Sequence, residues 1–268
     1  MTAVAFGERA AYLARHDALV IADLHVGRGE ASAVSLPLGE REDLVDRLAG
    51  LAARFDPATV VVAGDVVHTF DRVSDRSLGT LAALRDVCEA AGAELELVAG
   101  NHDTALASAW EGPVHGEYAL DAADIDNAEF RTIVCHGHEA PETAADRYVI
   151  GHVHPTIEIE GDRRPCFLRG EGVYRGADLL MLPAFTRLAP GVAVNDMRTG
   201  AFDSPLVTDA DRLSPVVYDP GAGDASDGGN ASDTGDASDA GDRSDTGGTS
   251  DAGAALRFPP LGEFRGLL

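Results

Sequence analysis

The segment that decides the fold is Ala18–His25, whose sequence is ALVIADLH. Its first five residues are apolar, which predicts a short buried β-strand. Asp23 and His25 follow at once, two residues apart. Side chains with this spacing on an extended chain point to the same side, so the two residues can bind one metal ion together.

The same order of strand and polar motif recurs twice in the first half of the chain. The apolar run Thr59–Ala63 ends at Gly64-Asp65, and Leu95–Ala99 ends at Gly100-Asn101-His102-Asp103. Two segments with apolar residues at helical spacing lie between the runs, Glu40–Phe55 and Ser77–Ala91. This order predicts a βαβαβ unit with its chemistry at the carboxyl ends of the strands, where open α/β sheets place their ligand crevices.

The second half of the chain is rich in predicted strands, which favours a second sheet facing the first. The predicted strands are Thr132–Cys135, Tyr148–Ile150, Thr156–Glu160, Asp178–Leu182 and Gly191–Asn195. The first of them is followed by His136-Gly137-His138 and the second by Gly151-His152-Val153-His154. Two more metal-binding motifs therefore stand at strand ends.

These motifs contain seven candidate metal ligands: Asp23, His25, Asp65, Asn101, His136, His152 and His154. A mixture of carboxylate, amide and imidazole groups suits two divalent cations that share one carboxylate. Asp65 is the natural bridge, because Gly64 before it permits a sharp turn. Seven of the nine histidines lie within or beside these motifs, whereas His16 and His115 are predicted to be surface residues.

The 268-residue chain is strongly acidic, with a formal charge of −24 and arginine as its only basic residue type besides histidine. The segment Asp219–Ala254 carries −8, so subtracting it leaves −16 for the rest of the chain. We interpret this as a surface adapted to a high-salt cytoplasm, where a Debye length of about 3 Å at 1 M salt removes most self-repulsion. No apolar run reaches the roughly 18 residues of a membrane span, and the first residues lack a secretion signal, so a cytoplasmic protein without membrane contacts is expected.

Composition divides the chain into three parts. Residues 1–218 are expected to form one enzymatic domain. Residues 219–254 consist almost entirely of Gly, Ala, Ser, Thr and Asp, which predicts a disordered acidic insertion because such residues bury too little surface to offset the entropy of ordering. Residues 255–268 are apolar again, and we expect them to return and dock on the domain.

The five motifs, taken in order, resemble those of the calcineurin-like metallophosphoesterase superfamily: Asp-x-His, Gly-Asp, Gly-Asn-His-Asp/Glu, His and Gly-His-x-His. The resemblance extends from about Leu19 to His154. It implies an α/β fold in which two mixed β-sheets flanked by helices form a four-layer αββα sandwich. Finer motifs resemble an archaeal branch related to the SbcD nuclease subunit and to phosphoesterases encoded beside DNA ligase: Ala22–Gly27, Gly64–His68, Leu182–Phe185 and Pro259–Leu261.

The resemblance also implies how the ligands are divided between two cations. One cation would be held by Asp23, His25 and His154. The other would be held by Asn101, His136 and His152, with Asp65 as the bridge. Mn²⁺ suits this oxygen and nitrogen set, with Fe and Zn²⁺ as alternatives.

The catalytic residues implied by the resemblance are His102 and Asp103. His102 would stabilise the transition state or protonate the leaving oxygen, and Asp103 would orient it. Three further residues are candidates for contacts with the ligands or the substrate: Arg28, His68 and His138.

The expected function is hydrolysis of phosphodiester bonds by metal-activated hydroxide. The family branch favours DNA or RNA as the substrate, a role in nucleic-acid processing or DNA repair, and association with repair or helicase proteins. Two alternatives stay open: a phosphatase or phosphodiesterase of small nucleotides or other metabolites, and a catalytically inactive metal-holding scaffold.

Overall fold

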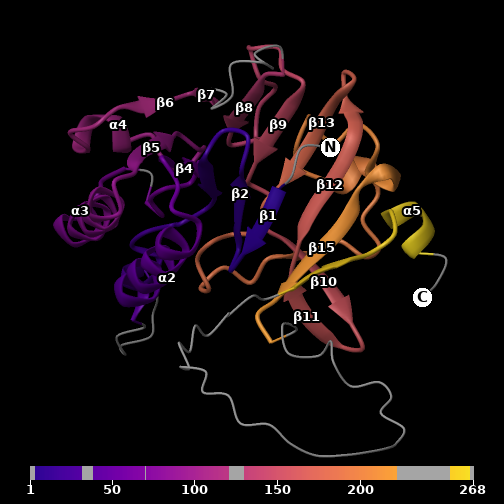
Figure 1. Cartoon of the computed structure of the whole chain (residues 1–268), viewed down its shortest axis with the longest axis horizontal. Helices are drawn as coiled ribbons and strands as arrows, with labels where there is room; N and C mark the ends of the chain where they lie inside the picture. Colours follow the sequence, from indigo (N-terminus) through magenta and orange to yellow (C-terminus); the bar gives the residue numbers. More distant parts are fainter. Residues whose placement is uncertain (1–3, 32–38, 70, 121–129, 222–253, 266–268) are drawn as a thin grey trace, which may run out of the picture.

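The predicted βαβαβ unit lies in a six-stranded sheet of the computed structural model, which describes residues 4–31, 39–69, 71–120, 130–221 and 254–265 (Figure 1). The strands, in sheet order, are β1 (Val4–Gly7), β2 (Ala10–Leu13), β3 (Ala18–Ile21), β4 (Thr59–Ala63), β5 (Glu94–Val98) and β6 (Val114–His115). From β3 to β6 they run parallel, whereas β1 and β2 are antiparallel to their neighbours. The two antiparallel strands were not predicted from the sequence.

Strand β3 is buried on both faces, which explains its continuous apolar sequence. Leu19 and Ile21 pack towards the helical side, whereas Ala18 and Val20 pack between the two sheets. The helical side is covered by α2 (Glu40–Phe55) and α3 (Asp75–Ala90). Helix α2 has the predicted bounds, and α3 begins two residues earlier than predicted.

The second sheet is also mixed and has seven strands. Its order is β16 (Ala254–Arg257), β15 (Ser214–Asp219), β12 (Phe167–Tyr174), β13 (Ala177–Met181), β9 (Arg147–Ile150), β8 (Thr132–Cys135) and β7 (Glu117–Leu120). Strands β8, β9 and β13 are parallel. A small third sheet contains β11 (Asp162–Pro165), β10 (Pro155–Ile159) and β14 (Val192–Ala193).

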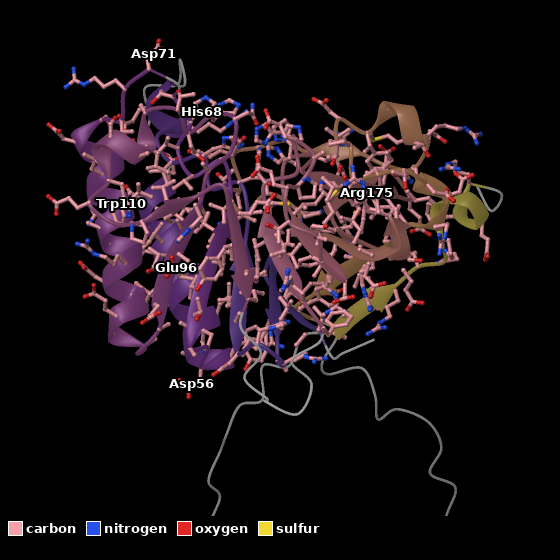
Figure 2. The ribbon with its side chains drawn as sticks, turned by 90° about the horizontal axis from the view of Figure 1, so that it is seen from above. Asp56, His68, Asp71, Glu96, Trp110 and Arg175 are labelled. Carbon is pink, nitrogen blue, oxygen red and sulfur yellow. The ribbon has the colours of Figure 1, made fainter. Side chains whose placement is uncertain are left out.

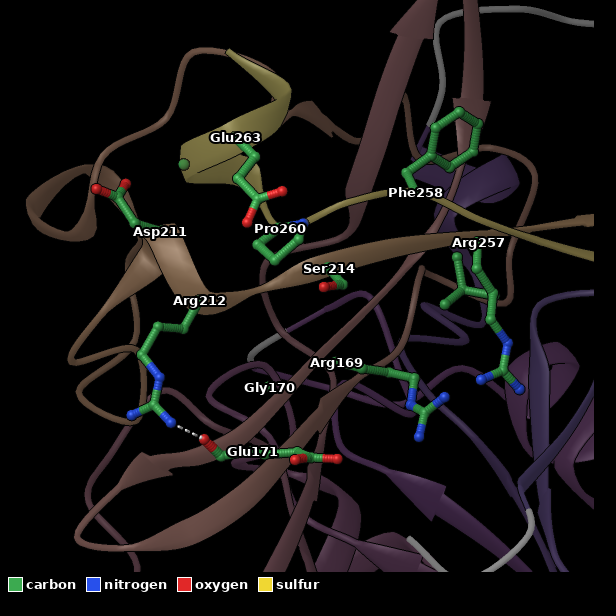
Figure 3. Close-up of a pocket in the computed structure, with 12 residues that line it drawn as sticks. Arg169, Gly170, Glu171, Asp211, Arg212, Ser214, Arg257, Phe258, Pro260 and Glu263 are labelled. Atoms are coloured by element: carbon green, nitrogen blue, oxygen red, sulfur yellow. Dashed lines mark hydrogen bonds between the residues drawn. The ribbon is translucent and has the colours of Figure 1, made fainter. Parts of the chain in front are cut away.

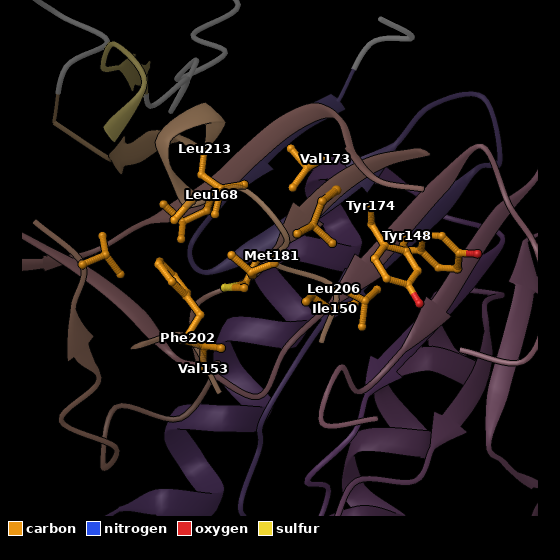
Figure 4. Packing of buried hydrophobic residues seen from close by; sticks show 14 of the residues in the cluster. Tyr148, Ile150, Val153, Leu168, Val173, Tyr174, Met181, Phe202, Leu206 and Leu213 are labelled. Carbon is orange, nitrogen blue, oxygen red and sulfur yellow. The ribbon is translucent and has the colours of Figure 1, made fainter. Parts of the chain in front are cut away.

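The outer face of the second sheet is covered by short segments rather than by long helices. The segments are η2 (Thr199–Ala201), η3 (Ala210–Arg212) and α5 (Leu261–Phe264). Figure 4 shows Phe202, Leu206 and Leu213 packed against the sheet residues Ile150, Leu168 and Met181. The expected four-layer αββα sandwich is therefore confirmed, with a thinner outer layer on this side. Two further short helices, α1 (Arg28–Ala31) and α4 (Leu106–Ala109), lie in loops of the first half.

The C-terminal segment contacts the body of the protein. Strand β16 pairs with β15 along Val216–Asp219, and the side chains of Leu261 and Phe264 are buried. Most of the predicted insertion, residues 222–253, lies outside the described residues, so the division of the chain into three parts stays a prediction. Within the described part of the chain, no helix is long and apolar enough to cross a membrane.

The prediction that His16 is a surface residue is wrong. Its side chain is buried, and its Nε2 lies 2.9 Å from the Thr132 hydroxyl on β8, so it joins the two sheets. His115 is half-buried rather than fully exposed, and its Nε2 lies 2.7 Å from a carboxylate oxygen of Glu96. Nothing in the local sequence indicates either long-range partner.

Candidate metal centre

The five motifs meet at one edge of the two facing sheets. Asp23, Asp65 and Asn101 follow β3, β4 and β5, whereas His136 and His152 follow β8 and β9. The loops are tied together by backbone hydrogen bonds, among them Asp23 N to Gly64 O at 3.1 Å and Gly151 N to His136 O at 3.1 Å. Figure 2 shows His68 near this edge and Asp56, which precedes β4, at the opposite edge.

One group of donors gathers around the Asp-x-His motif. It comprises Asp23, His25, Asp65 and His154, whose donor atoms lie within 4.8 Å of one another. His154 Nε2 lies 3.3 Å from His25 Nε2 and 3.4 Å from Asp23 Oδ1. These nitrogen and oxygen atoms face one another across a space that a cation fits.

A second group of donors surrounds His136. Its Nε2 lies 3.0 Å from Asn101 Oδ1, 3.2 Å from His152 Nδ1 and 3.3 Å from Asp65 Oδ1. Asp65 belongs to both groups, because its other oxygen lies 3.7 Å from His25 Nε2. The structure therefore brings all seven predicted ligands together in two groups that share one carboxylate.

The distances between donors fit bound metal ions. Ligands at about 2.1 Å from one cation lie roughly 3.0–3.4 Å apart in octahedral or tetrahedral geometry. The individual donor distances given above, from 3.0 to 3.7 Å, fall in or just above that range. Because the donors are oxygen and nitrogen atoms only, Mn²⁺, Fe and Zn²⁺ all fit the site chemically.

The protonation of the imidazoles also suits metal binding. His136 Nδ1 lies 3.2 Å from the Ala63 carbonyl oxygen, which can only accept, so Nδ1 carries the proton and the lone pair of Nε2 faces Asn101 and Asp65. Burial lowers the pKa of His25 to about 3 and that of His136 to about 4. Both rings are therefore neutral at pH 7, as a ligand must be.

Backbone strain is concentrated on the same residues. Five of the seven predicted ligands have a positive φ, between 46° and 71°: Asp23, His25, Asp65, His152 and His154. Residues with a side chain adopt this region at a cost of about 1–3 kcal/mol each, and such strain clusters at functional sites. The orientation of these five side chains therefore lowers the stability of the fold.

Three motif glycines make room for ligands that belong to other motifs. A Cβ atom on Gly64 would overlap the ring of His136, and one on Gly100 would overlap the carboxylate of Asp65. A Cβ on Gly151 would lie 2.6 Å from Asp23 Oδ2. The sequence suggested only a turn-forming role for Gly64, and the packing role depends on contacts between distant segments.

The half-buried Arg9 and the buried Arg47 hold the loop behind Asp23. The loop accepts hydrogen bonds from Arg9 Nη1 at the Ala184 and Thr186 carbonyls, and from Arg47 Nη2 at the Phe185 carbonyl, 2.7 Å away. Its own amide of Phe185 donates to the Ala22 carbonyl at 2.7 Å. These hydrogen bonds give the Leu182–Phe185 motif a structural role. No local sequence signal links this motif to Arg9 or Arg47.

Asp103 connects two loops of the site. Its carboxylate is buried and accepts hydrogen bonds from the amides of Val66, Val67 and Gly100, at 3.0, 2.9 and 2.7 Å. The Nδ1 of His102 lies 3.2 Å from the His68 carbonyl oxygen, and the expected orientation of His102 by Asp103 stays a prediction. Asp103 thus joins the Asp65 loop to the Asn101 loop.

The remaining candidates lie around the ligand groups. His102 Nε2 lies 3.9 Å from Asp65 Oδ2, and the His68 ring stacks on that of His102 at 5.9 Å. His138 contacts the other group, with its ring 5.1 Å from that of His136. The backbone amide of Arg28 donates to Glu40 at 3.1 Å, and its guanidinium makes no hydrogen bond or ion pair within the described residues.

Metal binding is expected to stabilise the folded protein. We expect Mn²⁺ at 100 times its dissociation constant to raise the free energy of unfolding by about 2.7 kcal/mol for each site. Thermal unfolding with and without EDTA, and metal content by mass spectrometry, measure the effect. A His154→Ala variant should retain one cation instead of two. If the wild-type protein binds neither Mn²⁺, Fe²⁺ nor Zn²⁺ tightly, the assignment of these ligands is wrong.

Comparison with known proteins identifies the family of this chain. The profile of the family described as calcineurin-like phosphoesterase matches residues 17–191. The Pseudomonas putida nuclease MPE has a similar structure, with a TM-score of 0.52, 23% identity, and coverage of 78% of this chain and 88% of that one. The Escherichia coli phosphoesterase YfcE matches with a TM-score of 0.40, 18% identity, and coverage of 65% and 83%. No curated protein sequence matches the chain significantly. Since the family profile spans more than half of its length, the chain belongs to the calcineurin-like phosphoesterase family.

Proposed function

We propose that this protein hydrolyses phosphodiesters at a centre of two divalent cations, with Mn²⁺ as the native metal. The observation that carries the proposal is the convergence of seven nitrogen and oxygen donors into two groups that share Asp65. When bound, the two cations would supply charge to neutralise the phosphate oxygens and to lower the pKa of the attacking water.

Two pockets beside the centre favour a diester over a monoester. A pocket of about 240 Å³ includes His154 in its lining, and another of about 570 Å³ includes His136. A phosphodiester has two substituents on phosphorus, whereas a monoester has one. Separate pockets next to each group of ligands give both substituents of a diester a place to bind.

His102 is the proposed acid or charge-stabilising residue. Its ring is partly exposed, and Nδ1 is held by the His68 carbonyl oxygen, so Nε2 faces the side of the centre near Asp65. There it can donate a proton or a hydrogen bond to an oxygen of the phosphate. The guanidinium of Arg28, which has no partner among the described residues, is a candidate for a second contact with the phosphate.

A nucleic-acid substrate is the preferred form of the proposal. The Pseudomonas putida protein of similar fold is a nuclease by name, and the motifs resemble a branch that includes nuclease subunits. We propose DNA processing or repair, in association with repair or helicase proteins, in a high-salt cytoplasm. Screening at molar salt removes the repulsion that a charge of −24 would otherwise exert on DNA.

Two chromogenic esters test the reaction class. We expect hydrolysis of bis-p-nitrophenyl phosphate to exceed that of p-nitrophenyl phosphate with Mn²⁺ in concentrated potassium chloride. Hydrolysis of the monoester alone would exclude the diesterase proposal. A metal-loaded protein that cleaves neither ester, oligonucleotide nor nucleotide would be a scaffold.

Replacing His102 with alanine should separate catalysis from metal binding. We expect kcat to fall by roughly 10²–10⁴-fold, the range for loss of an acid–base or charge-stabilising group, while metal content stays at two ions. His115→Ala removes a histidine that pairs with Glu96 outside the ligand groups, and should keep its activity. Full activity in His102→Ala would show that the residue is not catalytic.

A further inference from the structure

The pocket that includes His154 has an unusual charge for this protein. Three arginines line it, Arg9, Arg163 and Arg187, and among the described residues no aspartate or glutamate does. The whole chain has 45 acidic residues against 21 arginines. The charge of this pocket is therefore opposite in sign to the net charge of the chain.

The other pockets do not share this charge. The pocket of about 650 Å³ in Figure 3 also has three arginines, but Glu171, Asp211 and Glu263 line it with them. There Arg212 already donates to the Glu171 carbonyl oxygen. The pocket that includes His136 contains Glu117, Glu139 and Glu142 and, within the described part of the chain, no arginine. The two pockets beside the metal centre thus carry charged side chains of opposite sign.

Two arginines of the cationic pocket are available to a ligand, and a buried hydroxyl beside them lacks a partner. The side chain of Arg163 is exposed and makes no hydrogen bond or ion pair with any described residue. Arg187 pairs with Glu8 and Asp43 but remains 56% exposed. The hydroxyl of Thr156 is buried and has no hydrogen-bond partner among the residues the structure describes. A buried hydroxyl without a partner is costly unless a ligand or water satisfies it.

The positive charge around Arg9 is not fully neutralised. Burial and the neighbouring charges of Arg47 and Arg187 together lower the pKa of Arg9 to about 10, because Asp43 and Glu8 raise it by less than the two arginines lower it. Arg9, Arg47 and Arg187 thus face two carboxylates, and Arg163 adds a fourth cation to the lining of the pocket. The entry of an anion into such a site is therefore favourable.

We propose that the pocket formed by Arg9, Arg163, Arg187 and Thr156 binds a second phosphate group of the substrate, next to the one that is cleaved. The inference rests on the proposed function, since it extends the site of the scissile phosphate. It assigns a direction to the substrate: the phosphate-bearing side lies towards His154, and the other substituent lies towards His136. A nucleic-acid strand or a bisphosphorylated nucleoside both supply this chemistry.

Three thymidine dinucleotides test the proposal by rate. They are TpT, pTpT with an additional 5′-phosphate, and TpTp with an additional 3′-phosphate. For the wild-type protein we expect kcat/KM for one phosphorylated form to exceed that for TpT by roughly 10–100-fold, as for one or two charge-assisted hydrogen bonds. Arg163→Met should reduce this ratio to within about twofold of one, and Arg163→Glu should reduce it below one.

A neighbouring residue on the same strand provides the matched control. Arg164 lies outside the pocket and pairs with Asp219 at 3.8 Å, so Arg164→Met should retain the wild-type ratio. A ratio near one in the wild-type protein, with the diester cleaved normally, would overturn the second phosphate site and leave the proposed function intact.

Calorimetry separates the phosphate site from catalysis. The metal-loaded protein should bind thymidine 3′,5′-bisphosphate about tenfold or more tightly than thymidine 5′-monophosphate, and Arg163→Met should remove the difference. Tighter binding of the bisphosphate without cleavage of any ester would support the site while excluding the proposed function. Equal affinities in the wild-type protein would overturn the site. Rates on a single-stranded oligonucleotide, compared with pTpT, then distinguish a strand from a small nucleoside bisphosphate.

Discussion

Asp65→Asn is expected to reduce hydrolysis of the diester by at least about 10⁴-fold, to the background of the assay. Asp65 contributes one oxygen to each donor group, 3.7 Å from His25 Nε2 and 3.3 Å from His136 Nε2. An amide keeps the size of the side chain but presents a neutral oxygen and an NH₂ group that cannot bind a cation. The metal content, measured by mass spectrometry, should fall from two ions to one or none.

The control for this variant is Asp56→Asn. Asp56 has the same φ of 46° as Asp65, but it lies at the opposite edge of the sheet (Figure 2). Asparagine tolerates the left-handed region well, so the substitution removes one charge at an unchanged backbone conformation and does not touch the donors. Asp56→Asn should retain both cations and full activity. If Asp65→Asn also retains them, the two donor groups do not share this carboxylate.

The convergence of these side chains could be predicted from sequence because their signal is local. Each motif follows directly on an apolar run, and parallel strands end at one edge, so short segments such as Ala18–His25 already indicate where the side chains go. Helix α2 was predicted to the residue for the same reason, since apolar periodicity is contained within the helix itself. The structure places the donors in two groups, and the assignment of one cation to each group stays a prediction.

The residues that hold the ligands in place could not be predicted, because their partners are far away in sequence. Asp103 accepts from amides 36 and 37 residues earlier, and Arg47 donates to a carbonyl 138 residues later. The burial of His16 depends on Thr132 in the other sheet. The charge of the pocket beside His154 likewise combines Arg9, Arg163 and Arg187 from three separate loops and strands.

Gly64→Ala should test whether such long-range packing sets the metal site. The φ of Gly64 is +81°, and an added Cβ would overlap the ring of His136. Left-handed strain costs about 1–2 kcal/mol, and forcing an atom into a packed site costs about 1–3 kcal/mol more. We therefore expect the free energy of unfolding, measured by urea denaturation, to fall by about 2–5 kcal/mol. Displacement of His136 should also remove the cation of its group.

Gly92→Ala isolates the contribution of the backbone. Gly92 has a φ of +77°, close to that of Gly64, but an added Cβ would have no atom within 4 Å. This variant should lose only the strain term of about 1–2 kcal/mol and keep both cations. Since the two variants share their backbone conformation, any larger loss in Gly64→Ala measures the contact with His136. Equal losses, with metal content unchanged in both, would show that the ring can move aside and that the glycine is needed only for the turn.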